Sequence, residues 1–331
     1  MLTLFLCITV GFIAKKTKLL PDSAGTVMAK LETWVFCPAL SFTTMARFCT
    51  VATLKAHATN LLLASFCVVL AIFLGIFFAR FFVKDRSAER GIYRYSLTFA
   101  NAGYMGDPVV MAVLGDLAFS YYKLFCIPLS IATYTWGMIC LVPSTEKKNL
   151  FKKLFNAPMI ATFLGIIFGL TGLSAYIPTF ANNALDSLKG CMGPVAMLLA
   201  GFTVAKYDLI KMLKKTKVYA ATAFRLVILP IIIVGAMFGF RELLNTLFGL
   251  NIGNAPLFLE FFAVSMPLGL NTVVFPEAYG GNPETGASMA LISHTLCVTT
   301  TLSAPVSHFI SACQPLYHRL ISCAISAYST A

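Results

Sequence analysis

Amide and ionisable side chains lie inside long apolar stretches of the sequence. Asn101 and Asp107 share one stretch, Asn271 lies in a second, and His294 lies in a third. An amide N–H donates hydrogen bonds to a carboxylate, and a buried carboxyl or imidazole group can carry a proton. An ionisable group at membrane depth is energetically costly and marks a functional site by default. These residues indicate an anion site with proton carriers, although Asp107 could instead cap a half-helix and His294 could form an interhelical hydrogen bond.

Helix-breaking residues surround the same asparagines. One stretch holds Asn101, Gly103, Gly106 and Pro108, and another holds Pro267, Gly269, Asn271 and Pro276. Proline removes a backbone donor and glycine weakens a helix, so the freed N–H and C=O groups need a ligand, water or neighbouring side chains. If both helices break at the midplane of a membrane and cross, their half-helix N-termini form a seat for a carboxylate. The alternative is a pair of kinks that serve packing only.

The composition excludes an ordinary soluble protein. Of the 331 residues, 58% are hydrophobic and 11% charged, and the mean hydropathy is +0.82. Soluble domains average roughly 45 to 50% apolar and about 25% charged residues. The basic residues form short clusters between apolar runs, and the 10 cysteines show no metal-ligand spacing. We therefore expect a lipid bilayer around the chain, and no nucleic acid, metal or cofactor.

Apolar runs of membrane-spanning length predict an all-α integral membrane protein with ten transmembrane helices. A bilayer core about 30 Å thick needs about 20 apolar residues per helix. The runs cover approximately residues 2–14, 28–46, 59–83, 92–115, 117–142, 158–178, 186–205, 217–239, 254–278 and 285–312. They are continuous rather than alternating, which favours helices over the strands of a membrane barrel.

The distribution of lysine and arginine predicts the orientation. These residues concentrate on the odd-numbered connections, including Lys15 and Lys16 after the first run and the basic segment 143–157 after the fifth. Positive loops stay cytoplasmic, so both termini are expected outside. The segment 143–157 is interpreted as an interfacial cytoplasmic helix, or alternatively as a docking site for a partner. A bacterial inner (plasma) membrane is the expected location.

Corresponding features in the two halves predict an inverted repeat. The second run carries Pro38 and the seventh carries Pro194, and the fourth and ninth runs hold the helix breakers. Five spans per half is an odd number, so the second half enters the membrane upside down. The predicted organisation is a first five-helix repeat at 1–142, a basic linker at 143–157, an inverted repeat at 158–312 and a C-terminal tail at 313–331.

Several segments resemble the auxin efflux carrier family of membrane transporters. They are Phe99–Pro108 (FANAGYMGDP), Ser265–Pro267 (SMP) and Asn271–Glu284 (NTVVFPEAYGGNPE). The family includes bacterial malate and malonate permease-like proteins and the plant PIN auxin exporters, and the resemblance covers essentially the whole chain. It implies that broken helices four and nine cross beside an organic-anion site.

Site residues follow from the resemblance one by one. Ser41 is similar to a serine that faces the substrate in PIN proteins, Asn101 to an asparagine that contacts its carboxylate, and Tyr134 to a tyrosine of the pocket. Thr272 stands where PIN proteins have a second crossover proline, and Asp107 occupies a position that is usually apolar. The expected substrate-binding residues are Ser41, Asn101, Tyr104, Gly106, Pro108, Tyr134, Pro267, Gly269, Asn271 and Thr272, with Asp107 and His294 as candidates for proton coupling.

The remaining features have structural interpretations. Arg225 and Glu260 lie in predicted spans, where a structural pairing or a position near the headgroups is expected. The spacings Gly165/Gly169 and Gly235/Gly239 predict close helix packing. No motif for nucleotide binding, serine-hydrolase chemistry or zinc proteolysis occurs, so the chain is not expected to be an enzyme.

These observations together predict a secondary transporter of small organic anions. The substrate would be a mono- or dicarboxylate such as malate, or an auxin-like acid, moved by alternating access with possible proton or sodium coupling. A homodimer is compatible with this prediction. The alternatives are an anion sensor built on a transporter fold and a membrane enzyme that acts on a lipid.

Overall fold

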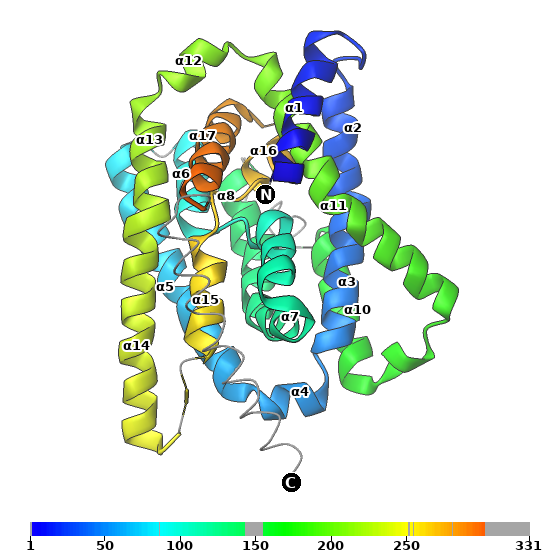
Figure 1. Cartoon of the computed structure of the whole chain (residues 1–331), viewed down its shortest axis with the longest axis vertical. Coiled ribbons are helices and arrows are strands. Elements are labelled where there is room, and N and C mark those ends of the chain that lie inside the picture. The colour runs from blue at the N-terminus through cyan, green and yellow to red at the C-terminus, as the bar shows by residue number, and fades with distance from the viewer. Residues whose placement is uncertain are drawn as a thin grey trace.

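The structure is a computed structural model that describes residues 2–85, 87–142, 155–250, 252–253, 255–279 and 281–301. These residues are almost entirely helical, as Figure 1 shows. Within them, the only strand-like contact is an isolated antiparallel bridge between Ala100 and Leu268. The all-α prediction is therefore confirmed. Most of the predicted linker (143–154) and the whole predicted tail (313–331) lie outside the described residues.

The helices follow the predicted apolar runs. In chain order they are α1 (Leu2–Lys16), α2 (Ala24–Leu31), η1 (Glu32–Phe36), α3 (Cys37–Phe48), α4 (Val51–Ala56), α5 (Ala58–Phe82), α6 (Ala88–Thr98), η2 (Ala102–Gly106), α7 (Asp107–Ala132), η3 (Thr133–Gly137), α8 (Met138–Leu141), α10 (Ala157–Thr171), η4 (Leu173–Tyr176), α11 (Thr179–Lys206), α12 (Leu209–Leu213), α13 (Thr216–Ala223), η5 (Phe224–Ile228), α14 (Leu229–Phe248), α15 (Ala255–Ser265), α16 (Asn271–Tyr279) and α17 (Glu284–Thr301). Side chains of Thr50, Ser87, Asn156 and Asp208 cap α4, α6, α10 and α12 by accepting backbone N–H groups.

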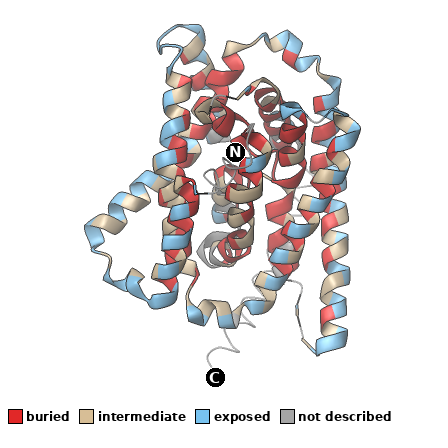
Figure 2. Cartoon of the chain, turned by 180° about the vertical axis from the view of Figure 1, so that it is seen from behind, coloured by how far each residue is buried: buried red, intermediate tan, exposed pale blue. Residues whose placement is uncertain are grey.

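The outer surface is apolar and the interior holds polar side chains. Four helical stretches of the described chain are long and apolar enough to cross a membrane: Ala58–Phe82, Tyr121–Leu141, Thr179–Lys206 and Thr216–Phe248. Figure 2 shows that the outward faces of the long peripheral helices are exposed. On α5 these faces carry Phe73 and Phe81, and on α14 they carry Ile231. Such an extensive apolar surface is unfavourable in water and favourable in contact with lipid.

Two helix pairs pack reciprocally. The first helix, α1, packs along α11, and α10 packs along α3. Both contacts are close because glycine lies in them: a Cβ on Gly165 would meet the Phe42 carbonyl oxygen at 2.7 Å, and one on Gly201 would collide with the Ile8 carbonyl. In each pair the first helix of one predicted half meets the second helix of the other half. Two structurally equivalent halves would produce this reciprocal packing. The number of ten membrane spans remains a prediction.

The helix α7 continues across the boundary between the fourth and fifth predicted spans, but it is not straight. The Lys123 ammonium lies 2.6 Å from the Asp107 carboxylate, and the Tyr122 hydroxyl lies 3.0 Å from the Ala102 carbonyl oxygen. Sixteen residues of straight helix would separate Asp107 and Lys123 by about 24 Å, farther than the two side chains reach together. The chain therefore turns back on itself between these residues.

The two glycine spacings differ in outcome. Gly165 and Gly169 contact the backbone of α3, which confirms close packing there. Gly235 and Gly239 are exposed on α14, and a Cβ at either would meet nothing within 4 Å. The packing prediction for Gly235 and Gly239 was wrong, because α14 turns that face away from the described helices.

These contacts predict that a larger side chain is accommodated at Gly235 but not at Gly165. Gly165→Leu should force α10 away from α3, at a cost of roughly 1 to 3 kcal/mol from overpacking, and should lower the apparent Tm by several degrees. Gly235→Leu is the matched control and should leave the Tm near that of the parent protein. The measurement is thermal unfolding in detergent, followed by size-exclusion chromatography. Equal Tm values for the two variants would contradict this assignment.

Candidate functional site

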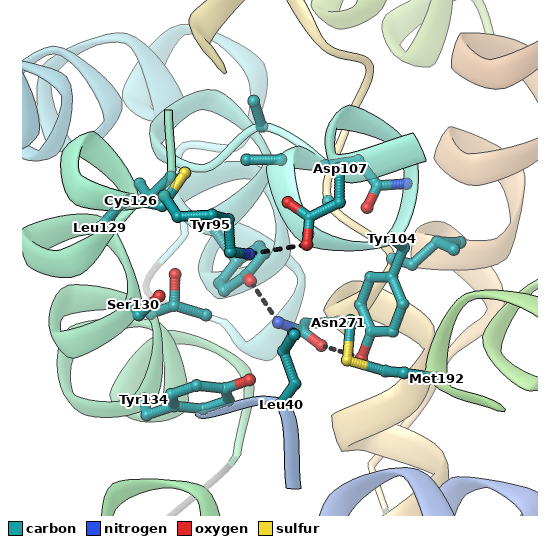
Figure 3. A pocket seen from close by; sticks show the side chains of 18 residues that line it. Leu40, Tyr95, Tyr104, Asp107, Cys126, Leu129, Ser130, Tyr134, Met192 and Asn271 are labelled. Carbon is teal, nitrogen blue, oxygen red and sulfur yellow. Dashed lines mark hydrogen bonds and ion pairs between the residues drawn. The ribbon is translucent and has the colours of Figure 1, made fainter. Parts of the chain in front are cut away.

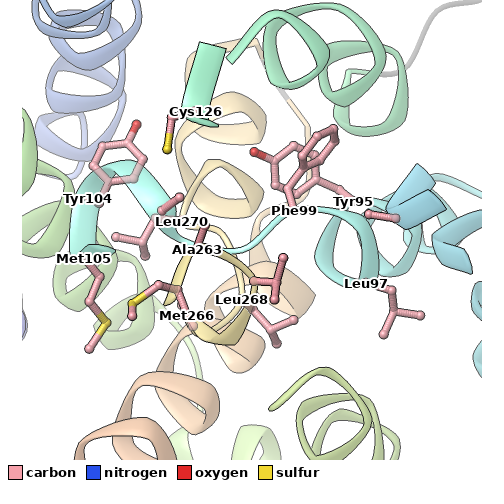
Figure 4. Close-up of a cluster of buried hydrophobic side chains, with 14 of the residues drawn as sticks. Tyr95, Leu97, Phe99, Tyr104, Met105, Cys126, Ala263, Met266, Leu268 and Leu270 are labelled. Carbon is pink, nitrogen blue, oxygen red and sulfur yellow. The ribbon is translucent and has the colours of Figure 1, made fainter. Parts of the chain in front are cut away.

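Two interruptions of helical structure cross in the middle of the molecule. One separates α6 from η2, and the other separates α15 from α16. The Asn101 backbone N–H donates to the Pro267 carbonyl at 2.8 Å, next to the bridge between Ala100 and Leu268. Figure 4 shows the two extended segments passing each other among buried side chains, including Leu97 and Leu268. The breaking residues thus act together as one crossing.

Arg225 binds the C-terminal ends of both interrupted helices. Its guanidinium donates to the Leu97 carbonyl at 3.2 Å and to the Val264 carbonyl at 3.0 Å, near the ends of α6 and α15. A helix C-terminus carries about half a negative charge, so one cation compensates two such ends. The residue is 1% exposed, so of the two positions expected for Arg225 the structure favours the structural pairing over a position near the headgroups. Its fork geometry lets a single side chain reach two carbonyls.

The opposite ends of the crossing face a cavity. η2 begins after Asn101 and leads into α7, and α16 begins at Asn271. An inner cavity of about 70 Å³ is lined by residues from both starts, among them Gly103, Tyr104 and Gly269. A helix start carries the positive end of the helix dipole, although at α16 the N–H groups of Thr272 and Val273 are already bound to the carbonyls of Gly269 and Leu270. The crossing therefore directs positive polarity into the inner cavity and negative polarity towards Arg225.

Asn271 organises the polar wall of the inner cavity. Its Nδ2 donates to the Tyr95 hydroxyl at 2.8 Å, and its Oδ1 accepts from the Tyr104 hydroxyl at 3.0 Å. Figure 3 shows these three side chains around the cavity, with Tyr134 on the adjoining wall. The Tyr104 hydroxyl also lies 3.4 Å from the Cys37 thiol, so it links α3 to this network.

A buried ion pair separates the inner cavity from a larger one. Asp107 and Lys123 line both the inner cavity and an outer cavity of about 680 Å³. Lys123 is 5% exposed and its ammonium lies 2.6 Å from one Asp107 oxygen, while the other oxygen has no partner within the described chain. The outer cavity reaches the surface at Arg47 and Lys189. A route thus leads to the crossing, with Arg47 and Lys189 at its mouth both paired with Asp186.

Ion pairs lie at the far end of the same helices. Lys206 on α11 contacts Glu277 on α16 at 2.6 Å, and Lys215 contacts Glu284 on α17 at 2.7 Å. Burial raises the pKa of the Tyr207 phenol just beyond α11, and the carboxylates of Glu277 and Glu284 raise it further. These contacts join α11 to α16 and the start of α13 to α17 on the side away from the outer cavity.

The other predicted site residues lie around the crossing but not all at the cavity. Asn101 and Tyr134 line the inner cavity, whereas His294 lies behind Asn101. The following do not appear in the lining of either cavity: Ser41, which is buried; Gly106, which packs on Tyr122; Pro267, whose carbonyl binds Asn101; and Thr272, whose hydroxyl donates to the Gly269 carbonyl. Pro108 is near the start of α7, and its side chain lies outside the described residues.

Comparison with known proteins decides the class of the molecule. The profile of a family described as membrane transport protein matches residues 1–304. The chain belongs to this family, the auxin efflux carrier family. It is accordingly an integral membrane protein of a transporter family rather than of an enzyme family. No individual curated protein matches the chain.

The sequence did not predict three residues that contribute to the site or to the crossing beside it. Lys123 was not predicted as a site residue, although an ionisable group inside the run 117–142 signals a functional site in the same way as Asp107 does. Tyr95 gave no sequence signal, because a tyrosine in an apolar helix is ordinary. Arg225 was noticed, but its two carbonyl partners are 128 and 39 residues away in the chain.

The role of Arg225 leads to a stability prediction. Arg225→Met should leave two buried carbonyls unpaired, at a cost of about 2 to 6 kcal/mol, and should lower the apparent Tm by about 5 °C or more. Arg225→Lys should be intermediate, since an ammonium lacks the fork. Arg80→Met, on the exposed face of α5, is the control and should change stability by less than about 0.5 kcal/mol. If Arg225→Met were as stable as Arg80→Met, the carbonyl contacts would not hold the crossing.

Proposed function

We propose that this protein is a secondary transporter of small organic anions, either mono- or dicarboxylates such as malate or auxin-like acids, and that it works by alternating access. The observation that carries the proposal is the inner cavity, where two helix starts, the Asn271 network and Lys123 converge. The helix starts and the Lys123 ammonium favour a negative ligand, and the amide and hydroxyl groups of the Asn271 network can donate hydrogen bonds to it.

The ion pair defines how a carboxylate would enter. Asp107 already neutralises Lys123, so an incoming carboxylate has to compete with Asp107 for the ammonium. In the proposed cycle the substrate carboxylate takes the place of Asp107 at Lys123, and Asp107 takes it back when the substrate leaves. Lys123 then has a counter-ion throughout the cycle, and the extra negative charge that the substrate brings beside Asp107 requires a proton or cation to enter with it, because an unpaired buried ion is strongly destabilising.

Two features support alternating access. The inner cavity adjoins the outer cavity through the residues that they share, including Tyr104, Asp107 and Lys123. At the other end the Lys206–Glu277 and Lys215–Glu284 pairs tie the helices together. In the proposed cycle this arrangement is the state open towards the Arg47 side, and release on the opposite side would require these pairs to separate.

The charge distribution supports a placement in the membrane. The basic connections stay in the cytoplasm, so both termini and the outer cavity face the outside of a bacterial inner membrane. The division into two inverted five-span repeats, proton or sodium coupling and assembly as a homodimer belong to the same proposal.

Uptake into proteoliposomes tests the function. Purified protein should accumulate radiolabelled malate or indole-3-acetate above protein-free liposomes, and an imposed proton or sodium gradient should identify the driving ion. Absence of both uptake and binding for these acids and a panel of related ones would overturn the proposal. Binding without uptake would point to a sensor instead.

Lys123 should be necessary for binding. Lys123→Met leaves the anion without its cation and strands Asp107, so uptake should fall by at least about 10-fold, the equivalent of 1.4 kcal/mol. The double variant Lys123→Met with Asp107→Asn removes the stranded carboxylate and should restore folding but not binding. Lys55→Met, on the exposed surface of α4, is the matched control and should transport normally. Normal uptake by the double variant would exclude Lys123 from the site.

A further inference from the structure

Asn101 and His294 form a buried pair beside the inner cavity. Asn101 Nδ2 lies 2.8 Å from His294 Nε2, and both residues are 2% exposed. The other ring nitrogen, Nδ1, lies 2.7 Å from the Ala290 carbonyl oxygen and 3.4 Å from the Ser293 hydroxyl. A carbonyl only accepts hydrogen bonds, so Nδ1 carries a hydrogen in both charge states of the ring. The nitrogen that gains or loses a proton is therefore Nε2.

The neutral ring fixes the amide of Asn101. An unprotonated Nε2 accepts a hydrogen bond, so Asn101 presents its Nδ2 to the ring. The Asn101 Oδ1 atom then has no hydrogen-bond partner within the described chain, although it is buried and the residue lines the inner cavity. An unpaired acceptor at that wall opposes the binding of a carboxylate, which also only accepts.

The backbone of Asn101 is fixed by hydrogen bonds, and the terminal amide of its side chain can still rotate. The Asn101 N–H is bound to the Pro267 carbonyl, and the Asn101 carbonyl accepts from the N–H groups of Met105 and Gly106. The residue is thereby held at the crossing from both sides. Rotation of the terminal amide is a soft torsion that exchanges Nδ2 and Oδ1 without moving the backbone.

We propose that protonation of His294 at Nε2 turns the Asn101 amide, so that its Oδ1 accepts from the imidazolium and its Nδ2 faces the inner cavity to bind the substrate carboxylate. One proton enters the site for each anion that binds, and no covalent bond changes. The imidazolium and the carboxylate neutralise each other in the buried site. His294 is a positioning residue here, because it acts through Asn101. The inference rests on the proposed function and specifies its coupling.

The charged groups around α17 leave this pair isolated. Within the described chain the hydrogen bonds of His294 go only to Asn101, Ala290 and Ser293. Of the elements packed against α17, α6 brings Tyr95, which is bound to Asn271, and carries Glu89, Arg90 and Arg94 on the turns farther from Asn101. The helices α11 and α16 bring Lys206 and Glu277, which pair with each other. Lys211 on α12 and Lys217 on α13 are exposed, and Glu284 at the start of α17 pairs with Lys215.

Anion binding measured against pH tests the switch. Between about pH 6.5 and 8.5 a free carboxylic acid stays ionised, so malate or indole-3-acetate can serve as probes without titrating themselves. The parent protein should lose affinity by up to about 10-fold per pH unit as the pH rises, and should take up close to one proton per anion from a weakly buffered solution. The direction follows because binding requires the protonated ring.

Two substitutions separate the switch from a structural role. The amide of His294→Gln can face Asn101 with either its oxygen or its nitrogen at any pH, so this variant should bind the probe with a flat pH profile and without proton uptake. His57→Gln, at the start of α5 and away from both cavities, is the matched control and should keep the slope. Equal slopes for His294→Gln and the parent protein would overturn the inference.

Nitrogen NMR of histidine-labelled protein gives an independent result on the parent chain. Of the 4 histidines, His294 is identified by its absence from the spectrum of His294→Gln, or by its slow exchange if that variant does not fold. The expected spectrum is a neutral ring with hydrogen on Nδ1 without the probe and an imidazolium with it. A ring that stays neutral when the probe binds refutes the switch but leaves the transporter proposal standing. Failure to bind at every pH refutes both.

Discussion

The architecture depends on one cation that binds two helix ends. A polypeptide can break its helices inside a membrane only if the freed backbone groups find partners, because lipid offers none. Arg225 donates to the carbonyls of Leu97 and Val264, and the two interruptions complete the arrangement by binding each other between Asn101 and Pro267. These contacts turn two separate defects into one stable crossing.

The same contacts separate charge across the crossing. The C-terminal ends of α6 and α15 are neutralised by Arg225, whereas the starts of η2 and α16 face the inner cavity. The polarity left for a ligand is therefore positive, and Lys123 adds a full charge to it. Asp107 balances that charge when the site is empty, which explains how an ammonium can remain buried. On the proposed function, Asp107 serves as a counter-ion that the substrate carboxylate replaces at Lys123.

The helices around the crossing are held together by two kinds of contact. The α1–α11 and α3–α10 pairs are tightened by glycines that admit backbone contact, and they behave as rigid units because such interfaces have no room to slide. The ion pairs at the ends of α11, α16 and α17 are partly buried, and the Glu277 side chain is only 7% exposed. In the proposed alternating-access cycle these pairs break and re-form, whereas the glycine contacts stay closed.

Composition determined that the chain lies in lipid, because a charged fraction of 11% cannot coat a water-facing surface. The long continuous apolar runs determined that it is helical. Local residue types also located the breaks, since proline and glycine act on the backbone wherever they stand. The partners were decided only by tertiary structure. Asn101 and His294 are 193 residues apart, Asn271 and Tyr95 are 176 apart, and the two carbonyls of Arg225 come from different helices. Lys123 meets Asp107 only because the chain turns back between them, and Gly235, which was predicted to pack against another helix, lies on the exposed face of α14. Sequence patterns report the needs of each segment, whereas a hydrogen bond between distant residues exists only after the whole chain has packed.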